Sequence, residues 1–478
     1  MSRSDTDISA MICSPDCPPL IFNNMTSQWE SRQWNIELLS HQITQKLSCK
    51  LSPRESQNLW ETQCIHEDVT LKEFYSWMQT NDDKSNPLYK YQPEDFSCYI
   101  DYKYMKDISP KEHLKAVDWE VFGFPGRDGT ESTIWIGTEG CYTNCHYDTY
   151  GFNLVAQIQG RKRWILFPPW ESFYLYPTRI PYEESSVFSE VNVKNPDYQQ
   201  HSEFKKANPY IVILEPGQVL YVPRHWWHYV ESLEDSISIN TWIDTEEDLE
   251  SRVSEAITRC LFSTLLGARD QLKEDHQEHQ SKKDHKEDNW INPGEEILPL
   301  DTNIQLLQLA LTMKYGAEEK DKNTQNMLCN ALRNIPVRGN DRFYRKKRKF
   351  SENLETYDKR EAAKNLKSEQ EEKCKLDRGD NLKEDLNEEL CSQDLLTSSG
   401  HDFPYIVIVE SKIKEDESKE IKPSKNGKTD LKSKTPANLC KSFAERCKNE
   451  TYSKVFERLV KSVLHPHVIQ TILTQLNQ

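Results

Sequence analysis

The residues with the clearest chemical potential are a histidine and an aspartate that stand one residue apart, His146 and Asp148. Both lie in Thr143–Gln157, a stretch that ends in a strand-like apolar run. Because residues two apart on a strand point to the same face, this spacing directs an imidazole and a carboxylate toward one point. Taken alone, the two residues also fit a hydrogen-bonded polar pair.

A third ligand would turn the pair into a metal site. The downstream stretch Val219–Val230 holds two candidates, His225 and His228. Two histidines and one carboxylate on one face of an iron ion leave the other positions open for a chelating cosubstrate and O2. The pattern therefore predicts a non-haem Fe(II) site assembled from two distant parts of the chain.

Short strand-like segments separated by glycine and proline turns must position these side chains. The turn Glu215–Gln218 suits a type II geometry, in which proline and then glycine occupy the two central positions. Many short strands with such turns predict a β-sandwich or barrel. Apolar residues at helical spacing predict flanking helices over Trp34–Ile43 and Leu71–Met78, the second capped by Thr70. The predicted strands are Cys98–Tyr104, Ser132–Gly137, Asn153–Ile158, Arg163–Phe167, Ile211–Leu214, Val219–Val222 and Ser236–Trp242.

Several motifs in fixed order resemble the jumonji C (cupin-type) domain family. They are His146–Asp148, Gly160–Pro169, Leu175–Pro177, Pro216–Pro223 and Trp226–His228. The similarity spans roughly residues 15 to 265. It is greatest to the branch that contains the asparaginyl hydroxylase called factor inhibiting hypoxia-inducible factor. The resemblance implies a mainly β fold with flanking helices, a double-stranded β-helix of the cupin or jelly-roll type.

The resemblance also implies a set of site residues. His228, rather than His225, joins His146 and Asp148 as a ligand of Fe(II). In this family 2-oxoglutarate chelates the iron, and a basic residue with hydroxyl support holds its distal carboxylate. The residues at matching positions are Lys162, Thr143 and Tyr99, with Asn153 and Asn240 as polar neighbours. An ammonium and two hydroxyl donors suit a buried carboxylate that would otherwise be costly to desolvate.

The reaction implied is that of an Fe(II)- and 2-oxoglutarate-dependent dioxygenase, with a protein or peptide as substrate and a hydroxylated side chain as product. Two alternatives stay open. One is N-methyl-lysine demethylation, which the same iron centre would serve. The other is a non-catalytic adaptor on the same fold, which would bind a partner such as a small heat-shock protein in the stress response.

Composition limits the partners and the compartment. The net charge of −16 gives no general reason to bind nucleic acid or anionic membrane. The sequence has neither an N-terminal apolar core of signal-peptide length nor a membrane-spanning apolar run. We expect a soluble cytoplasmic protein, with Arg342–Lys349 as a candidate nuclear-import signal. The 13 cysteines lack a framework spacing and are predicted to be reduced thiols.

The high charged fraction of 29% predicts that part of the chain is unpacked. Phe403–Val409 is an apolar island in this region and is predicted to be a short partner-binding strand. The C-terminal helices are expected to dock on the body or to pair in a homodimer. The predicted organisation is a disordered leader at 1–15, an α/β part at 16–130, the β-helix core at 131–245, a helical extension with a charged linker at 246–335, a largely disordered charged region at 336–440 and C-terminal helices at 441–478.

Overall fold

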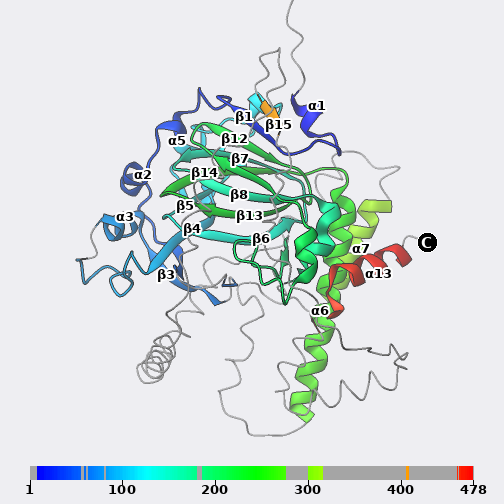
Figure 1. Cartoon of the computed structure of the whole chain (residues 1–478). Helices are drawn as coiled ribbons and strands as arrows, with labels where there is room; N and C mark the ends of the chain where they lie inside the picture. The colour runs from blue at the N-terminus through cyan, green and yellow to red at the C-terminus, as the bar shows by residue number, and fades with distance from the viewer. Residues whose placement is uncertain are drawn as a thin grey trace, which may run out of the picture.

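Two antiparallel β-sheets that face each other form the body of the protein in a computed structural model of the chain (Figure 1). The structure describes residues 8–54, 59–60, 63–79, 82–179, 186–275, 300–315, 405–407, 460 and 462–476. The predicted fold class, a mainly β cupin or jelly-roll architecture with flanking helices, is confirmed.

The larger sheet has nine strands among the described residues. In spatial order they are β15 (Tyr405–Val407), β1 (Leu20–Asn23), β12 (Gln218–Val222), β7 (Phe152–Gln159), β14 (Ser236–Ile243), β5 (Thr133–Gly137), β4 (Phe96–Tyr104), β2 (Leu47–Pro53) and β3 (Ile65–Val69). The strands β1, β2 and β3 are absent from the sequence-based prediction.

The smaller sheet has six strands in the described part of the chain. In spatial order they are β11 (Tyr210–Leu214), β8 (Lys162–Phe167), β13 (Trp227–Ser232), β6 (Tyr142–Asp148), β10 (Ser186–Ser189) and β9 (Pro177–Thr178). Its inner face packs against the larger sheet, where Trp164 and Leu166 of β8 share an apolar cluster with Val155 of β7 and Leu220 of β12.

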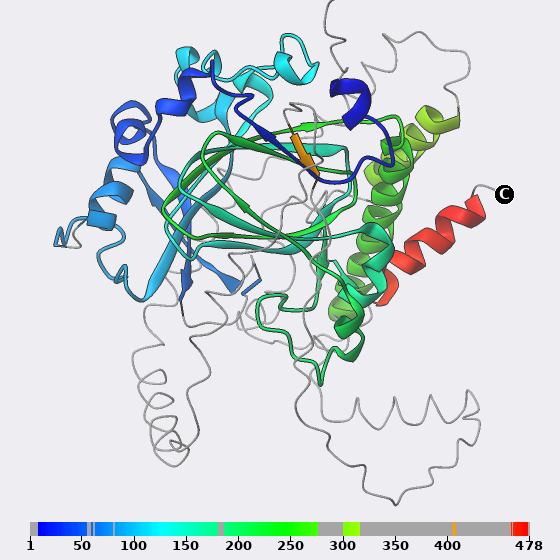
Figure 2. The same cartoon turned by 45° about the horizontal axis from the view of Figure 1, so that its top comes forward.

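Helices cover the outer face of the larger sheet and one end of the barrel (Figures 1 and 2). On β2 and β3 lie α2 (Ile36–Gln42) and α3 (Leu71–Gln79). The predicted Thr70 cap is present, since the Glu73 amide donates to the Thr70 hydroxyl over 3.1 Å. The remaining helices are α1 (Ile8–Ile12), α4 (Met105–Ile108), α5 (Lys111–Leu114), α6 (Asp248–Asp275), α7 (Leu300–Tyr315), α13 (Pro466–Leu476) and the 3-10 turns Glu30–Gln33, Glu120–Phe122, Gly129–Glu131, Pro169–Leu175 and Ser202–Lys206.

The described C-terminal helices dock on the same chain. Ile257 of α6, Ala310 of α7 and Leu473 of α13 belong to one apolar cluster. Of the two expected arrangements, docking on the body and pairing in a homodimer, the structure shows docking. None of the described helices is both long and apolar enough to cross a membrane. Most of the region 336–440, including Arg342–Lys349, lies outside the described residues, as does most of the chain predicted to be helical before His465.

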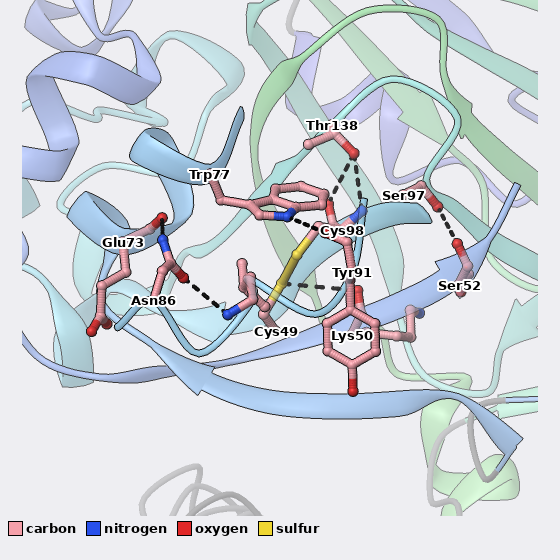
Figure 3. The surroundings of a disulfide bond; sticks show 11 residues. Cys49, Lys50, Ser52, Glu73, Trp77, Asn86, Tyr91, Ser97, Cys98 and Thr138 are labelled. Atoms are coloured by element: carbon pink, nitrogen blue, oxygen red, sulfur yellow. Dashed lines mark hydrogen bonds between the residues drawn. A yellow bond between two sulfur atoms is a disulfide. The ribbon is translucent and has the colours of Figure 1, made fainter. Parts of the chain in front are cut away.

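Two sequence-based expectations differ from the structure. Residues 8–12, placed in a disordered leader, form α1, because Ile12 is buried and its carbonyl accepts a 2.7 Å hydrogen bond from the Tyr221 hydroxyl. The prediction of reduced thiols is wrong for Cys49 and Cys98, which form a disulfide (Figure 3). Because Leu51 of β2 lies opposite Cys98 of β4, Cys49 is a diagonal neighbour of Cys98 on the same face.

Candidate metal centre

His146, Asp148 and His228 come together on the inner face of the smaller sheet. The strands β6 and β13 are antiparallel neighbours, and His228 stands directly opposite His146. Opposite residues in a sheet share a face, as do residues two apart on one strand. As a result, one nitrogen or oxygen atom from each of the three side chains lies within 4.8 Å of the other two.

Both imidazoles present the same nitrogen to the common point. The Nδ1 atom of His146 lies 2.7 Å from the carbonyl of Asn144, and Nδ1 of His228 lies 3.0 Å from the carbonyl of Trp226. A carbonyl only accepts hydrogen bonds, so each Nδ1 carries the proton and each Nε2 keeps its lone pair. Burial, together with the neighbouring His228, lowers the pKa of His146 to about 4. The ring is therefore neutral near pH 7, the form that binds metals.

Asp148 is held by a residue that the sequence analysis missed. The Trp242 indole donates a 2.9 Å hydrogen bond to Oδ2 of Asp148, and Oδ1 lies 3.7 Å from Nε2 of His146. The indole therefore fixes one carboxylate oxygen and leaves the other directed at the histidines. Trp242 stands two residues after Asn240 on β14 and so shares its face, a spacing that would have identified it.

Aromatic rings enclose the two histidines. Phe188 of β10 stacks on His146 with ring centroids 5.5 Å apart, and Trp164 of β8 lies against His228 at 5.7 Å. His228 is 4% exposed, and the His146 and Asp148 side chains are 12% and 18% exposed. The centre is thus shielded on the histidine side and reachable from solvent beside Asp148.

A β-bulge in β6 brings Thr143 to this face. His228 pairs with His146, but Val230 pairs with Thr143 rather than Asn144, so β6 carries one extra residue between them. A bulge reverses the alternation of side chains beyond it. Tyr142, Cys145 and Tyr147 accordingly pack together on the outer face, which leaves Thr143 on the inner face with His146 despite their odd spacing.

Lys162 lies deeper in the barrel, 2% exposed. Its ammonium donates a 3.3 Å hydrogen bond to the Tyr99 hydroxyl, and the Thr143 hydroxyl is also a partner of that phenol. Burial lowers the pKa of Lys162 to about 8. Among the described residues no carboxylate forms an ion pair with it. The Asp101 carboxylate, which pairs with Lys50, raises the pKa of Lys162 but forms no ion pair with it. A buried ammonium without a direct ion pair is suited to an anionic ligand.

The other two predicted residues, Asn153 and Asn240, lie on the facing sheet. Both are buried, and the amide nitrogen of Asn240 donates to the side-chain oxygen of Asn153 over 2.8 Å. The Trp135 indole donates to the oxygen of Asn240 over 2.7 Å. The pair therefore lies on the larger sheet, facing the smaller sheet.

A second buried lysine, Lys50 of β2, was also missed by the sequence analysis. Its ammonium forms a 2.7 Å ion pair with Asp101 of β4 and lies 5.3 Å from the centre of the Tyr99 ring. The Lys162 ammonium lies 5.2 Å from the same ring. Tyr99 is thus placed beside both lysines, one of which is neutralised by a carboxylate and one of which is not.

This donor set fits a ferrous ion. Two neutral imidazole nitrogens and one carboxylate oxygen on one side form the facial triad typical of non-haem Fe(II) oxygenases. The ligands also have the supporting hydrogen bonds that usually orient metal-binding side chains. His225, the other candidate, instead places Nε2 3.2 Å from the Thr149 carbonyl and 3.3 Å from the Ser251 hydroxyl, which indicates a structural role.

Comparison with known proteins gives a family match and named relatives. Residues 14–249 match the cupin-like domain family. The chain is 47% identical over 283 residues to HSPB1-associated protein 1 of Rattus norvegicus, which covers 58% of this chain and 56% of that protein. It is 42% identical over 310 residues to the Danio rerio homologue, covering 63% and 66%.

A more distant relative carries a different name. The chain is 28% identical over 232 residues to lysine-specific demethylase 8 of Danio rerio, covering 47% of this chain and 52% of that protein. The matches to the HSPB1-associated proteins span 52 to 66% of their own length.

Proposed function

We propose that this chain, whose residues 14–249 belong to the cupin-like domain family in its jumonji C form, is an Fe(II)- and 2-oxoglutarate-dependent dioxygenase, and specifically a protein hydroxylase. One observation carries the proposal. The His146, Asp148 and His228 triad shares a barrel interior with Lys162, a buried ammonium that has no carboxylate partner among the described residues.

In this proposal His146, Asp148 and His228 hold the metal on one side, and Trp242 keeps the Asp148 carboxylate in a single orientation. Bound iron and 2-oxoglutarate would supply O2 activation, so that one oxygen atom enters a C–H bond of the substrate while 2-oxoglutarate is converted to succinate and CO2.

Lys162 receives the distal carboxylate of 2-oxoglutarate, with the Tyr99 and Thr143 hydroxyls as further donors. Lys162 and Tyr99 are buried and Thr143 is half-buried, and charge-assisted hydrogen bonds are strongest away from solvent. Asn153 and Asn240, which are hydrogen-bonded to each other, lie on the facing sheet. The residues orient the cosubstrate and exclude water from its buried end.

Turnover of 2-oxoglutarate by the purified chain tests the oxygenase. Wild-type protein loaded with Fe(II) is expected to form succinate, and a His146→Ala variant is expected to form none. A His225→Asn variant is the matched control, since His225 has a positive φ of 62° that asparagine tolerates and it lies outside the triad. Equal succinate formation by wild-type protein and His146→Ala would overturn the proposal.

The substrate class needs a separate measurement. Proteins retained by an inactive Asp148→Ala variant should be analysed by mass spectrometry before and after incubation with active protein in 18O2. Incorporation of one labelled oxygen into a side chain supports the hydroxylase. Formaldehyde release with loss of a methyl group would instead favour a lysine demethylase, the activity for which a relative 28% identical to this chain is named.

A second candidate function rests on the names of the nearer relatives. Proteins 42 to 49% identical to this chain are called HSPB1-associated proteins, and we infer from that name an association with a small heat-shock protein. Binding of a purified small heat-shock protein to wild-type chain and to His146→Ala should be compared. Unchanged binding, together with no succinate from the wild type, would favour a non-catalytic adaptor.

We propose the cytoplasm as the compartment, with nuclear import through Arg342–Lys349 as an alternative.

A further inference from the structure

The edge of the larger sheet is covered by a strand from a remote part of the chain. Tyr405–Val407 forms β15, which runs antiparallel to β1 with Val407 opposite Leu20 and Tyr405 opposite Phe22. Figures 1 and 2 show the two strands side by side in both views. β15 is the outermost strand of this sheet among the described residues.

The strand beneath it, β1, is an unusual edge strand because both of its faces are buried. Leu20 and Phe22 are 2% and 0% exposed and belong to the main core, and Ile21 is 8% exposed and belongs to the cluster between the sheets. Edge strands are normally protected by charge, proline or covering elements, since their free N–H and C=O groups recruit other strands. Within the described residues, β1 is protected by β15.

The covering strand is short and tethered from far away. It pairs through three residues, whereas β12 on the other side of β1 pairs through four. About 90 residues of chain separate it from the end of α7. A tether of this length gives an effective concentration on the order of 1 mM. Such a concentration favours intramolecular pairing but leaves a three-residue strand open to competition.

We propose that the outer edge of β1 is a strand-acceptor site, which the chain's own Tyr405–Val407 occupies at rest and an extended apolar segment of a partner protein occupies when that strand leaves. The proposal does not depend on the iron chemistry. Main-chain hydrogen bonds supply affinity in this mode of recognition, and alternate side chains supply specificity.

The burial of β1 defines the partner's chemistry. Directly opposite residues share a face, so a partner strand places residues beside Leu20 and Phe22 on one face and beside Ile21 on the other. Both neighbourhoods are apolar. The partner segment is therefore apolar at consecutive positions, as is Tyr405–Val409 of this chain, and it lacks proline where its N–H groups meet β1.

Residue-resolved hydrogen exchange of the full chain tests the resting state. The N–H groups of β1 alternate between β12 and β15. In an Ile406→Pro, Val407→Pro variant, one of two consecutive donors toward β1 is lost whichever of them faces it. We expect one alternate set of β1 amides to lose protection while the set facing β12 keeps it, which also shows that the barrel is folded. Unchanged protection of both sets would overturn the proposal.

A peptide of residues 400–412 tests the acceptor site itself. We expect saturable binding to the double-proline variant and at least about tenfold weaker binding to the wild type, where the tethered strand competes. An Ile413→Pro, Lys414→Pro variant, changed outside the paired residues, should behave as the wild type. Equal affinity for all three proteins, or absence of binding to the double-proline variant, would refute the site. A concentration-dependent dimer that the double-proline variant loses would show that a second copy fills the edge, and it would refute intramolecular occupation.

Discussion

The charge state of Lys162 offers a strict test of the proposed cosubstrate site. Burial lowers the pKa of its ammonium from the usual value near 10.5 to about 8. If the distal carboxylate of 2-oxoglutarate binds only the protonated lysine, its affinity is constant below pH 7 and falls as pH rises through 8. The dissociation constant should double at about pH 8 and be about tenfold larger at pH 9.

The assay is direct titration of 2-oxoglutarate into the Mn(II)-loaded chain between pH 6.5 and 9.5, which needs no turnover. Two neighbouring groups titrate outside this window, since the pKa of His146 is lowered to about 4 and that of Cys141 is raised to about 11, both mainly by burial. A Lys162→Arg variant keeps the positive charge throughout, because guanidinium does not titrate here. Its affinity should therefore be independent of pH.

A Lys162→Met variant should bind 2-oxoglutarate about 100-fold more weakly than the wild type below pH 7, as expected when a charge-assisted hydrogen bond worth about 1.5–3 kcal/mol is removed. The difference should shrink toward pH 9.5, because the wild type loses affinity there and the variant does not. The reasoning fails if the wild type gives a flat profile. It also fails if the affinities of the wild type and of Lys162→Arg for 2-oxoglutarate fall in parallel at high pH, because a group at the metal centre, and not Lys162, would then be titrating.

Three further outcomes follow from the same contacts. The ligand-free Lys162→Met chain should be more stable than the wild type by up to about 3 kcal/mol below pH 8, because the folded state no longer holds a desolvated ammonium. This gain in the free energy of unfolding should shrink between pH 8 and 10.5. Urea unfolding at several pH values measures it. Trp242→Phe removes the donor to Asp148 and should weaken Mn(II) binding about tenfold, whereas Trp170→Phe, a tryptophan 75% exposed, should not change it. Glu255→Gln leaves the buried Arg179 guanidinium without its counter-ion between β9 and α6 and should cost about 3 kcal/mol in urea unfolding.

Several strands around the site were predictable because their apolar runs end at turns, although β10 and β13 were not predicted. The predicted range Asn153–Ile158 differs from β7 by one residue at each end, and Gly217 has the positive φ of 89° that its turn requires. The strand β2 was not predictable in the same way. A lysine in the middle of a segment indicates solvent exposure, and Lys50 therefore argues against a buried strand. In the structure, Lys50 is buried because it pairs with Asp101 of β4. A local pattern does not contain that partner.

Part of the site was predictable from the sequence because its residues follow the local period of a strand. His146 and Asp148 are separated by the period of a strand, so their shared face follows from spacing alone. Thr143 breaks that period, and the bulge that restores it appears only in the register with β13. The sequence therefore supports Thr143 by family resemblance and not by geometry. The disulfide between Cys49 and Cys98 likewise depends on the pairing of β2 with β4.

The two lysines beside Tyr99 distinguish a structural charge from a functional one. Lys50 is buried together with a carboxylate, Asp101, at 2.7 Å, so the fold itself compensates its desolvation. Lys162 is buried to a greater extent, and its ammonium donates to the neutral Tyr99 hydroxyl over 3.3 Å. A protein stabilised only by packing would gain by replacing such a residue with methionine. Keeping it lowers the stability of the ligand-free fold, and binding of a dianion beside the metal would recover that free energy. Within the described part of the chain, the lack of a direct ion pair at Lys162 is therefore stronger evidence for an anionic cosubstrate than the position of Lys162 in a motif.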